Sequence, residues 1–254
     1  MGRSMETVKG SYSQHELNEL LTNSQPRTGW DFSQMRTLRA PVPWDYGDVV
    51  ARYLAPSYEV LDVGTGDGRQ FASLAGKFRR GLGIDTDPEM IRLAAREHSS
   101  PSLEFRVGGA RLEGVATSFP VIINRHATID FGAVVAHLKP GGYFITQQVG
   151  ERNMACVKQA LGQSAGLPAI SAQELAGAGL RVVAFCEYDV EYVVCDVESL
   201  VFWLDALDLA HAGLEGAAVV MSVATFNKVL AGNVDRRGFV TNEHRYLAIG
   251  QAPL

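Results

Sequence analysis

The sequence predicts an α/β protein in which a doubly wound, mostly parallel sheet is covered by helices on both faces. Apolar segments of strand length alternate with segments of helical periodicity from residue 59 onward. Most of these strand segments are nearly continuous runs of apolar residues, which is typical of parallel strands buried on both sides. The 254 residues, 46% of them hydrophobic, are enough to bury one substantial core.

Residues 1–45 are expected to form an ordered N-terminal arm. The segment "SQHELNELL" (13–21) has helical spacing of its leucines behind a serine that could cap the helix. A second helix is expected from about residue 48 until Pro56 ends it. Aromatic residues are frequent here, namely Tyr12, Trp30, Phe32, Trp44 and Tyr46. They could line a cofactor or substrate, or they could simply fasten the arm to the body.

The repeated β-α pattern fixes the expected elements of the body. Strands are predicted at 59–64, 81–85, 103–109, 119–124, 139–150 (after a turn), 181–194 and 244–252. Helices are predicted at 68–78, 87–98, 128–138, 151–163, 171–180, 197–211 and 217–232. The segment 181–194 fits one strand or a bent pair. We expect a sheet domain from 46–195 and 238–254, and a helical cap inserted at 196–237.

The composition limits the classes of partner. A formal net charge of -5 and a pI of about 5.7 make nucleic acid an unlikely partner, because phosphate contacts need clustered Lys and Arg. The three cysteines (Cys156, Cys186, Cys195) form no CxxC pair, which favours a reduced, cytoplasmic chain. The sequence has no apolar run of membrane-spanning length, so no membrane association is expected.

The most informative stretches are "VLDVGTGDG" (60–68) and "GIDTD" (83–87). Glycines directly after a strand let the backbone and the N-terminus of a helix approach a ligand. A carboxylate at the end of the next strand can accept the hydroxyl protons of a ribose. Asp85 follows Gly64 by 21 positions, which suits one helix and a return strand. The loop departs from the dinucleotide pattern and carries Asp67, which favours a nucleoside with a cationic end, such as S-adenosylmethionine.

The two motifs closely resemble the first two motifs of class I (Rossmann-like) S-adenosylmethionine-dependent methyltransferases. "VIINRHA" (121–127) resembles the fourth-strand motif of that family, and "HLKPGGYFITQQVG" (137–150) its turn into the fifth strand. The resemblance covers about residues 45–150. It implies a seven-stranded sheet whose last strand is antiparallel, with S-adenosylmethionine as cofactor.

The resemblance also implies roles for individual residues. Gly64, Thr65 and Gly66 would lie along the methionine part of the cofactor, with Asp62 anchoring the loop, often toward the ammonium group. Asp85 would bind the ribose, and Asn124 would face the sulfonium. The remaining cofactor residues, which would flank the adenine, are Thr86, Met90, Gly109 and Ala110. Met90 could equally belong to the helix core, and Asp87 could simply cap its helix.

Three residues are candidates for catalysis. His126 follows the fourth strand of the motif set and could act as a general base, or it could only shape its loop. Arg125 could bind a carboxylate of the methyl acceptor. His211 could reach the site from the cap, although a histidine at a helix end is often exposed.

We therefore expect an S-adenosylmethionine-dependent methyltransferase that acts on a small-molecule acceptor. No metal site is expected, because Pro120 stands where metal-dependent members often have Asp. The alternatives are a nucleic-acid methyltransferase, a protein that binds the cofactor without transfer, and a cyclase that uses the sulfonium. The apolar stripes of 197–232 suit a lining for the acceptor or the face of a homodimer.

Overall fold

The computed structural model describes residues 7–24, 28–164, 166, 169–206 and 222–254. Its strands are β1 (Thr37–Arg39), β2 (Glu59–Val63), β3 (Arg80–Asp85), β4 (Leu103–Val107), β5 (Phe119–Arg125), β6 (Leu138–Val149), β7 (Arg181–Val194), β8 (Val234–Asp235) and β9 (Gly238–Gln251). Its helices are α1 (Gln14–Asn23), α2 (Tyr46–Ala51), α3 (Arg69–Ala72), α4 (Pro88–His98), α5 (Phe131–His137), α6 (Ala155–Ala160), α7 (Ala172–Gly177), α8 (Val197–Ala206) and α9 (Val223–Leu230).

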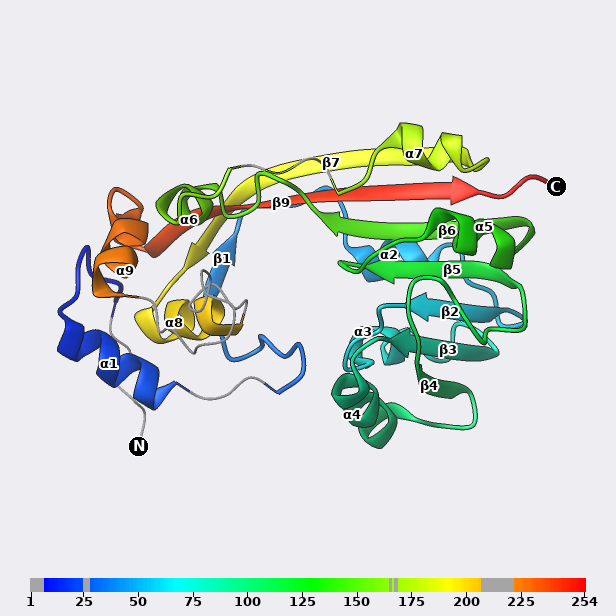
Figure 1. Ribbon diagram of the computed structural model, residues 1–254, viewed down its shortest axis with the longest axis horizontal. Coiled ribbons are helices and arrows are strands. Elements are labelled where there is room, and N and C mark those ends of the chain that lie inside the picture. Colours follow the sequence, from blue (N-terminus) through cyan, green and yellow to red (C-terminus); the bar gives the residue numbers. More distant parts are fainter. Residues whose placement is uncertain (1–6, 25–27, 165, 167–168, 207–221) are drawn as a thin grey trace. The chain divides into compact units, whose positions relative to one another are not determined.

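The described strands form one sheet in the order β1-β7-β9-β6-β5-β2-β3-β4, with β8 paired to β9. Strand β2 is parallel to both β3 and β5, and β3–β4 and β5–β6 are parallel as well. These five strands lie side by side in Figure 1, whereas β9 is antiparallel to β6. The seven strands from β7 to β4 therefore confirm the predicted sheet, and the chain order reverses between β2 and β5.

The chain divides into two compact units. One comprises Val42–Gly150, Pro168–Tyr188 and Arg245–Leu254, and we call it the sheet unit. The other comprises Met1–Pro41, Glu151–Leu167 and Asp189–His244, and we call it the helical unit. Strands β7 and β9 have residues in both units.

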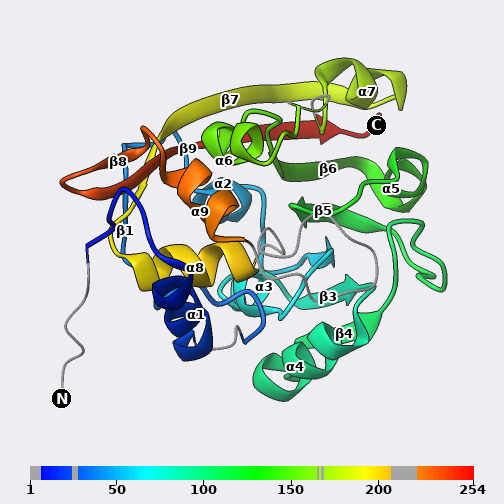
Figure 2. The same cartoon turned by 60° about the vertical axis from the view of Figure 1, so that its left-hand side comes forward.

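Two apolar clusters cover the two faces of the sheet unit. Side chains of α2, α3 and α4, such as Val50, Phe71 and Ile91, pack with one set of strand residues. Figure 2 shows α4 alongside β4. Side chains of α5 and α7, such as Val134 and Leu175, pack with the alternate set. This two-sided burial is what the continuous apolar strands predicted.

The helical unit has its own core, in which α1, α6, α8 and α9 bury residues such as Leu17, Val157, Leu200 and Phe226. The serine predicted to cap the first helix does so: Ser13 and Glu16 form a reciprocal capping box at the start of α1. The predicted arm aromatic Tyr12 is buried here against Phe226, with ring centroids 5.5 Å apart.

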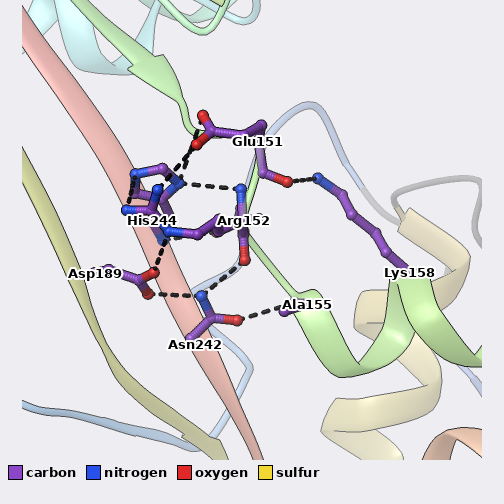
Figure 3. A network of polar contacts seen from close by, with 8 residues as sticks. Glu151, Arg152, Ala155, Lys158, Asp189, Asn242 and His244 are labelled. Atoms are coloured by element: carbon purple, nitrogen blue, oxygen red, sulfur yellow. Dashed lines mark hydrogen bonds and ion pairs between the residues drawn. The ribbon is translucent and has the colours of Figure 1, made fainter. Parts of the chain in front are cut away.

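A polar network in the helical unit joins the loop after β6 to residues of β7 and β9 (Figure 3). Arg152 Nε donates to Asp189 Oδ2 at 3.1 Å, and its backbone N–H donates to Nδ1 of the fully buried His244 at 3.1 Å. Asn242 Nδ2 donates to Asp189 Oδ1 at 2.6 Å and to the Arg152 carbonyl at 2.7 Å. Arg152, Asp189 and His244 lie at or next to the bounds of the segments that form this unit, so the network joins the ends of those segments.

The structure differs from the sequence predictions in several elements. The helix predicted at 68–78 is regular only over α3, because the bonds that follow, such as Leu74 N–H to Phe71 C=O at 3.0 Å, span three residues. The short strand β1 was not predicted, and 181–194 is one strand. His211 and the rest of 207–221 lie outside the described residues. Among the helices that are described, none combines the length and hydropathy needed to cross a bilayer.

Candidate functional site

The glycine loop after β2 folds back onto the end of β3. The backbone N–H groups of Gly64 and Thr65 both donate to the Ile84 carbonyl, at 2.8 and 2.9 Å. Gly64, Gly66 and Gly68 have φ values of 79°, 56° and 73°, which is the left-handed region that glycine adopts without steric cost. The sequence forms this turn because three of its five residues tolerate that backbone.

Packing also requires glycine at position 64. A side chain added there would place its Cβ 2.1 Å from the Cβ of Ala127, in the loop that follows β5. The two loops therefore touch where the chain order of the sheet reverses. In open α/β sheets this is the place where ligands bind, at the carboxyl ends of the strands.

Asp85 lies at the tip of β3, and its carboxylate holds the glycine loop. Its Oδ2 accepts from the Gly66 N–H at 2.8 Å, and its Oδ1 accepts from the Asp87 N–H at 3.0 Å. A carboxylate has about four lone-pair directions, so these two bonds leave acceptor capacity for a ligand. The pairing of this acid with the glycine loop was predicted from their spacing, and the structure brings them into contact.

Asp62 lies within β2 and is 6% exposed. The pKa of its carboxyl group is raised to about 7, mainly by burial and in part by the charge of Asp85. The nearby Thr65 side chain and the positive charge of Arg125 act in the opposite direction on the same pKa. A buried carboxyl group with this environment would be stabilised in its charged form by a cationic ligand group.

The residues predicted to flank an adenine gather beyond Asp85. A Cβ at Gly109, which follows β4, would lie 3.5 Å from Thr86 Cγ2, and the Gly108 N–H donates to the Asp85 carbonyl at 2.9 Å. Ala110 follows Gly109, and Met90 lies half-buried in the first turn of α4.

Asp87, by contrast, caps a helix. It accepts the N–H of Glu89 at 2.8 Å and of Met90 at 3.4 Å, at the N-terminus of α4. This confirms its interpretation as a helix cap.

Asn124 is 1% exposed, and its side chain is hydrogen-bonded to residues of neighbouring strands. Its Nδ2 donates to the Val63 carbonyl at 2.9 Å, and its Oδ1 accepts from Thr146 Oγ1 at 2.9 Å and Gln148 Nε2 at 2.6 Å. The side chain thus ties β2, β5 and β6 together. Sequence analysis missed Thr146 and Gln148, although polar residues in an otherwise apolar strand were a visible signal.

Arg125 and His126 occupy the end of β5 and the residue after it. Arg125 Nη1 donates to Gln70 Oε1 at 3.2 Å, and its guanidinium lies 5.6 Å from the Tyr46 ring centre. His126 has φ of 56° and keeps an exposed face. Its Nε2 lies 3.2 Å from Gln147 Nε2. Partial removal of the ring from water lowers the pKa of His126 to about 3, and the positive charges of Arg245 and Arg125 contribute to the shift.

Two of the aromatic residues for which a lining role was considered, Tyr46 and Trp44, lie next to residues of β5 and β6. Tyr46 is buried, and its hydroxyl donates to the Asn124 carbonyl at 3.0 Å. Burial raises the pKa of Tyr46, and the charge of Asp62 adds to the effect. Trp44 Nε1 donates to Gln147 Oε1 at 2.9 Å. Gln147 was not predicted, because its role depends on a residue 103 positions away.

Three further predictions concern a metal site, His211 and the aromatic residue Phe32. In the described part of the chain, no three His, Cys, Asp or Glu side chains gather closely enough to hold a metal ion. His211 lies outside the described residues, so its role stays a prediction. Phe32 packs on Phe202 in the helical unit, with ring centroids 6.0 Å apart.

Comparison with known proteins agrees with this geometry. Residues 60–142 match the family model described as a methyltransferase domain. This segment runs from β2 into β6 and contains every residue discussed above as a cofactor candidate. A search of curated proteins found no match.

Solved structures share the fold. A functionally unknown protein from Deinococcus radiodurans R1 has a TM-score of 0.60 at 18% identity, covering 87% of this chain and 92% of its own. A candidate methyltransferase from Bacillus halodurans C-125 has a TM-score of 0.56 at 14% identity, covering 83% and 99%. The (4+2) cyclase SpnF has a TM-score of 0.52 at 18% identity, covering 82% and 80%.

At these sequence identities, the solved structures show only that the fold is shared. Residues 60–142 therefore match a methyltransferase domain, and the order of the sheet agrees with the resemblance of this chain to class I, Rossmann-like S-adenosylmethionine-dependent methyltransferases.

Proposed function

We propose that this protein binds S-adenosylmethionine at the tips of β2, β3 and β4 and transfers its methyl group to a small-molecule acceptor. One observation carries the proposal. The glycine loop is bonded to the Asp85 carboxylate at 2.8 Å, and it follows the strand β2, which carries the buried carboxyl group of Asp62. This arrangement offers an acceptor for hydroxyl groups at Asp85 and a site for a cationic group at Asp62.

The residues present fit the parts of this cofactor. Asp85 would accept the ribose hydroxyls, and Asp62 would face the ammonium group, with Gly64, Thr65 and Gly66 along the methionine part. Thr86, Met90, Gly109 and Ala110 would border the adenine. Asn124 would contribute by fixing the strand tips at the sulfonium end, since its side chain already bonds to three neighbouring residues.

The bound cofactor supplies an electrophilic methyl group on a sulfonium that is already a good leaving group. The protein then has to orient the methyl acceptor in line with that group and keep water away. Arg125 and His126, at the end of β5, are the charged and polar groups we assign to the acceptor side.

A small molecule is the acceptor class that fits the composition. The net charge of -5 disfavours the phosphate contacts of a nucleic-acid methyltransferase. The roles of the arm (1–45), the helical cap (196–237) and His211 toward the acceptor stay predictions. A cytoplasmic location and a homodimer remain part of the same proposal.

Calorimetric titration with S-adenosylmethionine tests the binding site. We expect Asp85→Asn to weaken binding at least tenfold, because the amide cannot accept both hydroxyl protons and its NH₂ opposes one of them. Asp87→Asn is the matched control, since it changes an exposed acid two residues away and keeps the oxygen that caps α4. Equal affinity of the two variants would contradict the site.

Release of S-adenosylhomocysteine tests transfer. The purified protein is incubated with the cofactor and separate pools of carboxylic acids, amines, phenols and thiols. Product with one pool supports a small-molecule methyltransferase. Binding without product in any pool would instead indicate a binding protein, and loss of a substrate without S-adenosylhomocysteine would indicate a cyclase.

A further inference from the structure

Three side chains of the sheet unit form a hydrogen-bonded chain that ends on His126. Trp44 Nε1 lies 2.9 Å from Gln147 Oε1, and Gln147 Nε2 lies 3.2 Å from His126 Nε2. Gln147 is 4% exposed, so this chain runs through the interior behind the imidazole. It leaves the other ring nitrogen, Nδ1, without a partner in the described part of the chain.

The chemistry of the three groups fixes the direction of each hydrogen bond. The indole N–H can only donate, so the atom of Gln147 that faces Trp44 has to be the amide oxygen. The NH₂ of Gln147 therefore faces His126 and donates to it. The Nε2 of His126 has to be the unprotonated nitrogen, and the proton of the neutral ring then resides on Nδ1.

Both ends of the chain are held in place. The Trp44 ring packs on the Tyr188 ring, with centroids 4.7 Å apart. At the other end, the His126 backbone N–H donates to the Gln147 carbonyl at 2.9 Å, and His126 has the left-handed φ of 56°. Non-glycine residues with this backbone are uncommon and cluster at functional sites.

The surroundings also disfavour a second proton on the ring. A protonated Nε2 would oppose the NH₂ of Gln147, and the charges of Arg125 and Arg245 act on the ring from β5 and β9. The lowered pKa of His126 agrees with this geometry. His126 is therefore poorly suited to the role of general base and well suited to donating one hydrogen bond from Nδ1.

Arg125 indicates which kind of group would receive that hydrogen bond. Its Nη1 is bonded to Gln70, whereas its Nε is buried and has no hydrogen-bond partner in the described residues. A guanidinium next to a neutral N–H donor suits a carboxylate, which accepts several hydrogen bonds and balances the positive charge.

We propose that Trp44 and Gln147 are positioning residues that hold His126 as a neutral Nδ1–H donor, and that the methyl acceptor presents a carboxylate to His126 and Arg125. This deepens the proposed function and rests on it for the identity of the reaction. The tautomer of His126, by contrast, is a property of the protein alone.

Nitrogen NMR of protein labelled at histidine tests the tautomer without cofactor. We expect His126 Nε2 to have the shift of an unprotonated nitrogen and Nδ1 that of a protonated one, unchanged from pH 5 to 8. Gln147→Glu should reverse the tautomer, because a carboxylate requires Nε2–H. Trp44→Phe should raise the Nε2–H population, because the amide is then free to rotate.

Gln70→Ala is the matched control, since it removes a partner of Arg125 and leaves the chain from Trp44 to His126 intact. Its spectrum should equal that of the parent. A parent protein with Nε2–H, or a Trp44→Phe variant with an unchanged tautomer, would overturn the positioning role. A role limited to stability would leave these shifts unmoved.

Titration with sodium acetate tests the carboxylate. We expect a saturable shift of His126 Nδ1 that is lost in Arg125→Gln and absent with sodium chloride at equal ionic strength. An equal response to chloride, a full response in Arg125→Gln, or no response to acetate would overturn this assignment. If the tautomer is as expected but S-adenosylmethionine does not bind, the proposed function fails while the positioning role stands.

Discussion

Asp62 occupies a strand position at which water cannot solvate its carboxylate. Its pKa is about 7, against an ordinary value of 3.8, mainly because of burial. Between these two pH values the folded chain retains a proton that the unfolded chain has released. Raising the pH from 4 to 7 therefore destabilises the fold through this residue, and the full cost is present above pH 7. A residue retained at such a cost is a reasonable place for a cationic ligand group.

The first residue-scale prediction concerns Asp62→Asn. We expect the variant to be more stable than the parent at pH 8, by at most about 4 kcal/mol, with the difference vanishing towards pH 4. Urea unfolding of both proteins across this pH range measures the difference. S-adenosylmethionine should bind the variant more weakly, although the variant is more stable. A stability difference that does not change with pH would contradict the assignment of the raised pKa.

At the scale of single elements, α6 shows how one part of the chain completes another. Its N-cap, Met154, has a left-handed backbone and offers no side-chain cap. Asn242, in β9, takes over this function: its Oδ1 accepts the Ala155 N–H at 2.9 Å and its backbone carbonyl accepts the Met154 N–H at 3.1 Å. The first N–H groups of a helix need such partners.

We therefore predict that Asn242→Ala lowers the free energy of unfolding by about 1–3 kcal/mol, because it leaves the Ala155 N–H and the Arg152 carbonyl without their partner. The midpoint of urea unfolding measures the loss. Asn233→Ala is the comparison, since Asn233 donates to the Val229 and Ala231 carbonyls at the end of α9 and satisfies no N–H group at the start of a helix. Similar losses in both variants would argue against the cap.

At the scale of the whole molecule, most of the sheet could be predicted because its strands are long, apolar and separated by periodic helices. The exceptions have local causes. Strand β1 has only three residues, "TLR", and exists because Leu38 and its neighbours pair with residues 192–194 of β7. The helix after the glycine loop was predicted too long, since nothing in "SLAGKF" distinguishes three-residue turns from a regular helix except Gly76, which has φ of 87°.

The site was predictable to the extent that it is local in sequence. Asp62, Gly64 and Asp85 lie at or next to the ends of strands in a recognisable order, and the structure brings the glycine loop and Asp85 into contact. The partners of Asn124 were visible as the polar residues Thr146 and Gln148 in an otherwise apolar strand. The partner of His126 was not predictable, because the role of Gln147 depends on Trp44, which lies 103 positions away. Hydrogen bonds between distant residues leave no periodic pattern.

The two long strands β7 and β9 lead to a prediction for the whole chain. Each continues from one compact unit into the other, so we expect the two units to unfold together. We expect one calorimetric transition whose van't Hoff and calorimetric enthalpies agree. Two resolved transitions, or a van't Hoff enthalpy about half of the calorimetric one, would show that the units unfold separately.

The contact of Gly64 with Ala127 and the burial of Asp62 have opposite consequences for how the sequence can drift over generations. A descendant that no longer bound any nucleoside would still need glycine at position 64, since its neighbours leave room for nothing else. The acid at position 62 would be free to mutate, and mutation would even strengthen the fold. Among descendants of this chain, loss of the acid beside a retained glycine would therefore mark those that had abandoned the ligand.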